Sequence, residues 1–120
     1  MPTVREIQAQ AGEKPITMLT AYDAVTATLV DQAGVDITLI GDSMGNAVLG
    51  YEDTLPVTVD EVASRTGAVA RGVEDALVVS DMPFLSFGAD RRESVENCGR
   101  MIKEEGANAV KIESGEHTLE

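Results

Sequence analysis

Short apolar runs alternate along the chain with longer stretches of mixed polarity. The runs predict four β-strands, at 16–20, 36–40, 76–80 and 108–112, the first of which is expected to be buried. The longer stretches predict helices at 4–11, 24–33, 59–71 and 91–105, and a long connection at 44–57. Strands that alternate with helices indicate parallel pairing with right-handed crossovers.

Each predicted helix begins at a residue type that caps helix N-termini. Such a side chain accepts a hydrogen bond from a backbone N–H of the first turn, which otherwise has no partner. The capping residues are Thr3 with Glu6, Asp23, Thr58 with Glu61, and Asp90 with Glu93. Glycines that end helices are expected at Gly34, Gly72 and Gly106.

Four βα steps fit two folds, an open doubly wound sheet or part of a (β/α)8 barrel. No G-x-G-x-x-G motif follows the first strand, which argues against a dinucleotide-binding fold. Gly41, Gly45 and Gly50 have the wrong spacing for that motif and are interpreted as loop glycines. The phosphate-binding motif G-x-x-x-x-G-K-[ST] is also absent.

Composition restricts the class of protein further. Of 120 residues, 43% are hydrophobic, which is enough for one small core and too much for a disordered acidic tail. No apolar run is long enough to span a membrane, and the polar N-terminus shows no secretory signal. The lone Cys98 fits a reducing compartment, so we expect a cytoplasmic protein in which this thiol is structural.

The charge of the chain bears on its partners. The chain has nine Lys and Arg residues and 21 Asp and Glu residues, which gives a net charge of −12. Such a surface repels nucleic-acid phosphates and anionic lipid, so we expect neither a nucleic acid nor a membrane as partner. Only three of the cations are lysines, a pattern that salt adaptation would favour and that an ordinary acidic protein also shows.

The chemically informative residues stand at the predicted strand ends. Asp42 and Ser43 follow the second strand, Asp81 follows the third, and the fourth carries Lys111 and then Glu113. Parallel strands end at one edge, so three carboxylates and one ammonium group should converge there. Oxygen ligands suit Mg²⁺ before Zn²⁺. A single Asp after a strand is more often a helix cap, whereas a Lys inside an apolar strand needs a carboxylate or an anion.

Other residues give weaker signals. Tyr22 and Tyr51 are expected to pack at the rim, and Phe84 and Phe87 to fill the core or an interface. His117 lies beyond the fourth strand, and we assign it no role.

Five segments together resemble the N-terminal part of the ketopantoate hydroxymethyltransferase family. The similarity runs from Thr3 to Gly115, and several long matches in order are far more specific than one motif. The segments are TAYDAVTATLVDQAGVD (20–36), GDSMGNAVLGYEDTLPVTVDE (41–61), AVARG (68–72), DMPFLSFG (81–88) and GRMIKEEGANAVKIESG (99–115).

The resemblance implies a (β/α)8 barrel that forms a high homo-oligomer. The implied reaction transfers a one-carbon unit from 5,10-methylenetetrahydrofolate to 3-methyl-2-oxobutanoate, giving 2-dehydropantoate for pantothenate and coenzyme A synthesis. By match, Asp42, Asp81 and Glu113 correspond to Mg²⁺ ligands. Asp42, Ser43 and Asp81 correspond to the keto-acid site, and Lys111 to the residue that contacts the anionic end of that substrate.

The sequence departs from the family pattern in two respects. Ser64 and Arg65 replace the aromatic-His pair that usually precedes the AV-x-RG stretch. The family's catalytic base is a Glu on a later strand, beyond Glu120, and a full barrel needs roughly 250 residues. We therefore expect residues 1–120 to be the truncated N-terminal part of one barrel domain, with about four βα units and little or no activity in isolation.

Two other functions stay open. One is a different Mg²⁺-dependent barrel that forms an enolate, such as a 2-keto acid carbon–carbon lyase, which folate dependence would distinguish. The other is a non-catalytic βα fragment that only associates with partner chains, and that would bind Mg²⁺ and keto acid without turnover.

Overall fold

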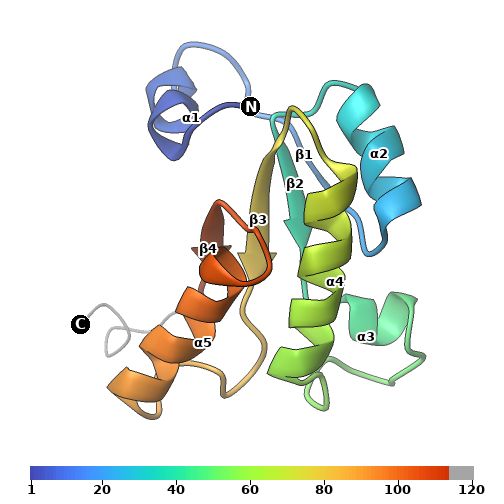
Figure 1. Cartoon of the computed structure of the whole chain (residues 1–120), viewed down its shortest axis with the longest axis vertical. Coiled ribbons are helices and arrows are strands. Elements are labelled where there is room, and N and C mark those ends of the chain that lie inside the picture. Colours follow the sequence, from blue (N-terminus) through green and yellow to red (C-terminus); the bar gives the residue numbers. More distant parts are fainter. Residues whose placement is uncertain (114–120) are drawn as a thin grey trace.

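The computed structural model describes residues 1–113, which form a parallel sheet with helices along it (Figure 1). Residues 114–120, and with them His117, lie outside the described part. The helices are α1 (Val4–Gln10), α2 (Ala24–Gln32), α3 (Met44–Ala47), α4 (Val59–Gly72) and α5 (Arg91–Lys103). The strands are β1 (Met18–Thr20), β2 (Ile37–Ile40), β3 (Leu77–Asp81) and β4 (Ala109–Lys111).

The sheet has the strand order β1-β2-β3-β4, and every neighbouring pair is parallel. Helix α2 packs against α4, and α4 against α5, so the helices form a row beside the sheet (Figure 1). A doubly wound sheet would reverse its strand order at a switch point. The consecutive order instead gives successive βα units of a (β/α)8 barrel, which resolves the choice that the sequence left open.

Register and alternation divide the sheet into two faces. Ser80 Oγ lies 3.0 Å from Thr66 Oγ1 of α4, so this face of the sheet packs on the helices. Ile40 and Val78 point to the same face and are fully buried in the core. Asp81, next to Ser80 on β3, therefore points to the opposite face, which corresponds to the inside of a barrel.

Local signals placed the helices well. The capping boxes of α1 and α4 are both formed, and Asp23 and Asp90 cap α2 and α5. Within residues 1–113, none of the helices is long and apolar enough to cross a membrane.

Two details of the predicted elements were wrong. The strand expected to be buried, β1, is exposed, with Met18 and Leu19 about half accessible, because β2 is its only described neighbour in the sheet. The connection at 44–57 contains the short helix α3, which four residues are too few to reveal as a pattern. The predicted end of α4 at Gly72 is confirmed, and a Cβ there would lie 2.5 Å from the carbonyl oxygen of Ala24, so this glycine also permits close packing on α2.

Asp31 joins the end of α2 to the loop before β3. Its carboxylate is buried and accepts backbone N–H groups from Glu74 at 2.9 Å, Asp75 at 3.2 Å and Ala76 at 2.8 Å. Burial raises the pKa of Asp31, but these three hydrogen bonds outweigh it and lower the pKa below its ordinary value. The carboxylate thus fixes where β3 begins.

We predict that Asp31→Asn lowers the free energy of unfolding by about 2 kcal/mol at pH 7, because one charged acceptor of three N–H groups is lost. The folded-state pKa is lowered, so the stabilisation is complete above the unfolded pKa of about 3.9 and is lost as pH falls through the folded value. Denaturant unfolding across pH measures both effects. Glu96→Gln, which breaks an exposed pair with Arg92, is the control and should change little; equal losses would contradict the prediction.

Candidate functional site

The carboxyl ends of β3 and β4 place an ammonium group between two carboxylates. Asp81 and Lys111 are register partners on neighbouring strands. Lys111 Nζ lies 3.1 Å from Asp81 Oδ2 and 3.0 Å from Glu113 Oε1, since Lys111 and Glu113 are two residues apart. The structure therefore brings these three predicted residues together. The helices run opposite to the strands, so the carboxyl ends of the strands lie at the end of the molecule where α4 and α5 begin (Figure 1).

Asp81 is the buried member of this group. It is 7% exposed, and its Oδ1 has no hydrogen-bond partner among the described residues. Burial raises the pKa of Asp81 above its ordinary value, and the negative charges of Asp42 and Glu113 add to this, while Lys111 opposes it. A buried oxygen with no partner beside other carboxylates is suited to binding a cation or accepting a proton.

Lys111 is less buried than its apolar strand suggested. Its side chain is 43% exposed, because β4 is an edge strand of the described sheet. Partial burial lowers the pKa of Lys111, but the hydrogen bonds to Glu113 and Asp81 outweigh it and raise the pKa. The ammonium group stays charged, and one side of it remains accessible to an anion.

Asp42 and Ser43 follow β2 on the same edge. A Cβ at Gly41 would lie 3.4 Å from Ser43 Oγ and 3.5 Å from Asp81 Oδ2, so both groups border the space that the missing side chain leaves. The charge of Asp42 is close enough to raise the pKa of Asp81. All five residues that the sequence singled out thus lie along one edge.

The three carboxylates do not, however, surround one point. Across residues 1–113, no group of three or more His, Cys, Asp or Glu side chains is arranged to hold a metal ion. Lys111 Nζ lies between Asp81 and Glu113 and forms a hydrogen bond to each carboxylate. The unpartnered Oδ1 of Asp81, with Asp42 nearby, still has the chemistry for a hard divalent cation.

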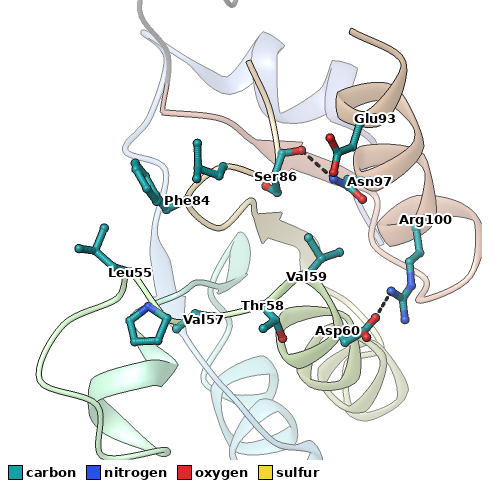
Figure 2. Close-up of a pocket in the computed structure, with 12 residues that line it drawn as sticks. Leu55, Val57, Thr58, Val59, Asp60, Phe84, Ser86, Glu93, Asn97 and Arg100 are labelled. Atoms are coloured by element: carbon teal, nitrogen blue, oxygen red, sulfur yellow. Dashed lines mark hydrogen bonds and ion pairs between the residues drawn. The ribbon is translucent and has the colours of Figure 1, made fainter. Parts of the chain in front are cut away.

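The sequence did not reveal a groove next to this edge. An open pocket of about 490 Å³ lies between the start of α4 and the β3–α5 loop, and Figure 2 shows the residues that line it. Its walls combine apolar side chains with polar ones, and two dashed contacts bridge them, Arg100 with Asp60 and Asn97 with the Ser86 carbonyl. The lining residues are Leu55, Pro56, Val57, Thr58, Val59, Asp60, Phe84, Leu85, Ser86, Glu93, Asn97 and Arg100.

The loop that follows Asp81 borders the groove and has an uncommon backbone. Leu85 has φ +63°, a left-handed conformation that costs a branched residue some strain. Phe84 is 57% exposed, so it does not fill the core, whereas Phe87 does pack against it. In the sequence, the signal that could have revealed this groove is the apolar pair Phe84-Leu85, which follows the strand end closely and forms part of the groove wall.

Comparison with known sequences identifies the family. The sequence profile described as "Ketopantoate hydroxymethyltransferase" matches residues 2–120. The chain belongs to the ketopantoate hydroxymethyltransferase family. It is 76% identical over 120 residues to the 3-methyl-2-oxobutanoate hydroxymethyltransferase of Haloarcula marismortui, and 54% identical over 112 residues to that of Pseudothermotoga lettingae.

The match to the Haloarcula protein covers 100% of this chain and 45% of that protein. The match to the Pseudothermotoga protein covers 93% of this chain and 42% of that protein. The chain thus spans less than half the length of these curated relatives. The resemblance inferred from the quoted segments is confirmed.

Solved structures confirm the fold of this family member. Phosphoenolpyruvate phosphomutase from Streptomyces platensis subsp. rosaceus superposes with a TM-score of 0.70 at 21% identity, over 92% of this chain and 38% of that one. 2,3-Dimethylmalate lyase, a PEP mutase/isocitrate lyase superfamily member, superposes with a TM-score of 0.66 at 19% identity, over 99% and 41%. The described sheet is therefore a part of this barrel fold.

We predict that Lys111→Met raises the pKa of Asp81 further in the metal-free protein. Lys111 provides the two effects that lower this pKa, while burial and the neighbouring carboxylates, which raise it, remain. A carbon-13 NMR titration of the Asp81 carboxyl group measures the shift. Lys103→Met, at the far end of α5, is the control and should leave the value unchanged; a lower or unchanged pKa in Lys111→Met would contradict the assignment.

Proposed function

We propose that this edge binds 3-methyl-2-oxobutanoate and takes part in its hydroxymethylation. The one-carbon unit would come from 5,10-methylenetetrahydrofolate, and the product would be 2-dehydropantoate for pantothenate and coenzyme A synthesis. The observation that carries the proposal is the Asp81–Lys111 pair, with a buried Asp81 oxygen left unpartnered, at the strand ends of this family member.

The keto acid presents a carboxylate and a neighbouring carbonyl. Lys111 would attract the anionic end with its accessible ammonium group, which its two carboxylate neighbours keep charged. Ser43 would donate a hydrogen bond to the keto acid beside Gly41, where no side chain obstructs it. Together these groups would fix the orientation of the carbon that gains the new bond.

The reaction removes one proton from C3 of the keto acid and forms a bond from that carbon to the bridging carbon of the folate. Both C–N bonds of the bridging carbon break, and one water supplies the new hydroxyl group. The protons from C3 and from water end on the two folate nitrogens, which leaves tetrahydrofolate. The catalytic base is inferred to be a Glu on a later strand of the family fold. Accordingly, we propose that residues 1–120 are the N-terminal part of one barrel domain and have no turnover in isolation.

Asp81 and the neighbouring Asp42 would hold Mg²⁺, and Glu113 would complete the set once its carboxylate is released from Lys111. Bound there, Mg²⁺ would polarise the keto carbonyl as a Lewis acid. The support is the donor set, which is all oxygen, and the unpartnered Asp81 Oδ1. Asp42 and Asp81 also border the proposed keto-acid site, so the same carboxylates would orient both ligands.

The proposed setting of the protein follows from its charge and family. We infer a cytoplasmic high homo-oligomer whose partner is the small-molecule substrate, with neither nucleic acid nor membrane. The net charge of −12 disfavours association with phosphate-rich surfaces.

We predict that Asp81→Asn in the complete natural gene product lowers formation of 2-dehydropantoate by a factor of about 100 or more, the order of loss when one key charged group is removed from a transition state. Turnover is measured with 3-methyl-2-oxobutanoate, 5,10-methylenetetrahydrofolate and Mg²⁺. Asp75→Asn is the matched control, because that carboxylate is exposed in the loop before β3, at the other end of the strand.

Each reagent omission has its own expected result. Chelation should abolish activity and added Mg²⁺ should restore it. Turnover of a keto acid without the folate would contradict the proposed reaction and favour a carbon–carbon lyase. Full activity of Asp81→Asn would show that the carboxylate of Asp81 is not needed for the reaction, and would contradict the proposed role of this edge.

A further inference from the structure

Tyr22 links two loops at the carboxyl edge of the sheet. It lies between β1 and α2, and its hydroxyl oxygen is 2.7 Å from Ser43 Oγ, which follows β2. The two residues are 21 positions apart in the chain, so this contact depends on the fold and not on local sequence. Tyr22 is not one of the predicted site residues, and this contact connects it to Ser43 of the proposed keto-acid site.

The hydroxyl of Tyr22 is held in place from several directions. Its ring is partly buried and packs against the hydrophobic core. The preceding residue, Ala21, donates its N–H to the Leu39 carbonyl at 3.1 Å and so continues the pairing with β2. Arg65 of α4 donates to the Tyr22 carbonyl at 3.4 Å. A tyrosine fixed in this way presents its O–H at a constant position.

Ser43 has a hydroxyl that local structure does not use. It is the N-cap residue of α3, yet it has helical dihedral angles and its side chain makes no capping hydrogen bond. A hydroxyl has one proton to donate and lone pairs to accept with. If Tyr22 donates to Ser43 Oγ, the proton of Ser43 is free to point into the space beside Gly41 and Asp81.

We propose that Tyr22 is a positioning residue for substrate binding. Its O–H donates to Ser43 Oγ, and this directs the Ser43 proton toward an oxygen of the bound 2-keto acid. The inference rests on the proposed function, because it requires Ser43 to contact the keto acid. It goes beyond that function by assigning a residue that acts through Ser43 and does not touch the substrate.

The chain contains a matched control in its other tyrosine. Tyr51 also lies at this edge, but its hydroxyl donates to Glu61 Oε1 of α4 at 2.8 Å. The hydrogen bond to that carboxylate raises the pKa of Tyr51. Tyr51→Phe therefore removes one hydrogen-bonded phenol oxygen from the same rim without affecting Ser43.

The test compares Y22F, Y51F, S43A and the double variant Y22F/S43A in the complete natural gene product. For Y22F we expect KM for 3-methyl-2-oxobutanoate to rise about tenfold, because Ser43 loses the partner that directs its hydrogen bond to the charged keto acid, with kcat within about threefold of the parent. Y51F should match the parent. The double variant should match S43A, because Tyr22 has nothing to position once the Ser43 hydroxyl is gone.

Thermal unfolding of each variant separates positioning from folding. Phe keeps the ring that packs on the core, so the midpoint of Y22F should lie within about 2 °C of the parent. A parental KM in Y22F would overturn the inference and leave the proposed function standing. So would a tenfold effect of Y22F that persists in the S43A background. A parent protein that neither binds nor converts the keto acid would overturn the proposed function and the role of Tyr22 with it.

Discussion

The register between β3 and β4 is the constraint on which the candidate site depends. It sets Asp81 opposite Lys111, so that an ammonium group meets a buried carboxylate within hydrogen-bond distance. Side chains alternate between the faces of a sheet, so a slip of one residue would turn Lys111 toward the helices. Two hydrogen bonds between the strands oppose such a slip: the Val78 N–H donates to Asn108 Oδ1 at 2.8 Å, and the Met82 N–H donates to the Lys111 carbonyl at 3.0 Å.

Local chemistry predicted most of the fold from the sequence. Capping residues act within four positions, and the four helices that they marked all form. The helix α3 was missed because one turn has no recognisable period. The Asp31 clamp was missed because its N–H partners lie 43 to 45 positions away, and a sequence does not show which distant backbone a buried carboxylate will reach.

The sequence predicted which residues lie together at the candidate site, but not how their side chains are arranged. Parallel strand ends were enough to place Asp42, Asp81 and Lys111 on one edge. That Lys111 lies between Asp81 and Glu113 depends on side-chain conformations that spacing does not determine. The contact between Tyr22 and Ser43 depends likewise on how two loops approach each other.

The central claim is that this edge holds a hard cation and a keto acid together. A crystal structure of the complete natural gene product with Mn²⁺ in place of Mg²⁺ and 3-methyl-2-oxobutanoate tests it most directly, because anomalous scattering locates the ion independently of the protein. The account predicts an ion bound by Asp81 Oδ1, which is unpartnered among the described residues, with the keto acid beside Ser43 and Lys111. An ion and keto acid bound elsewhere, with Asp81 still paired only with Lys111, would contradict it.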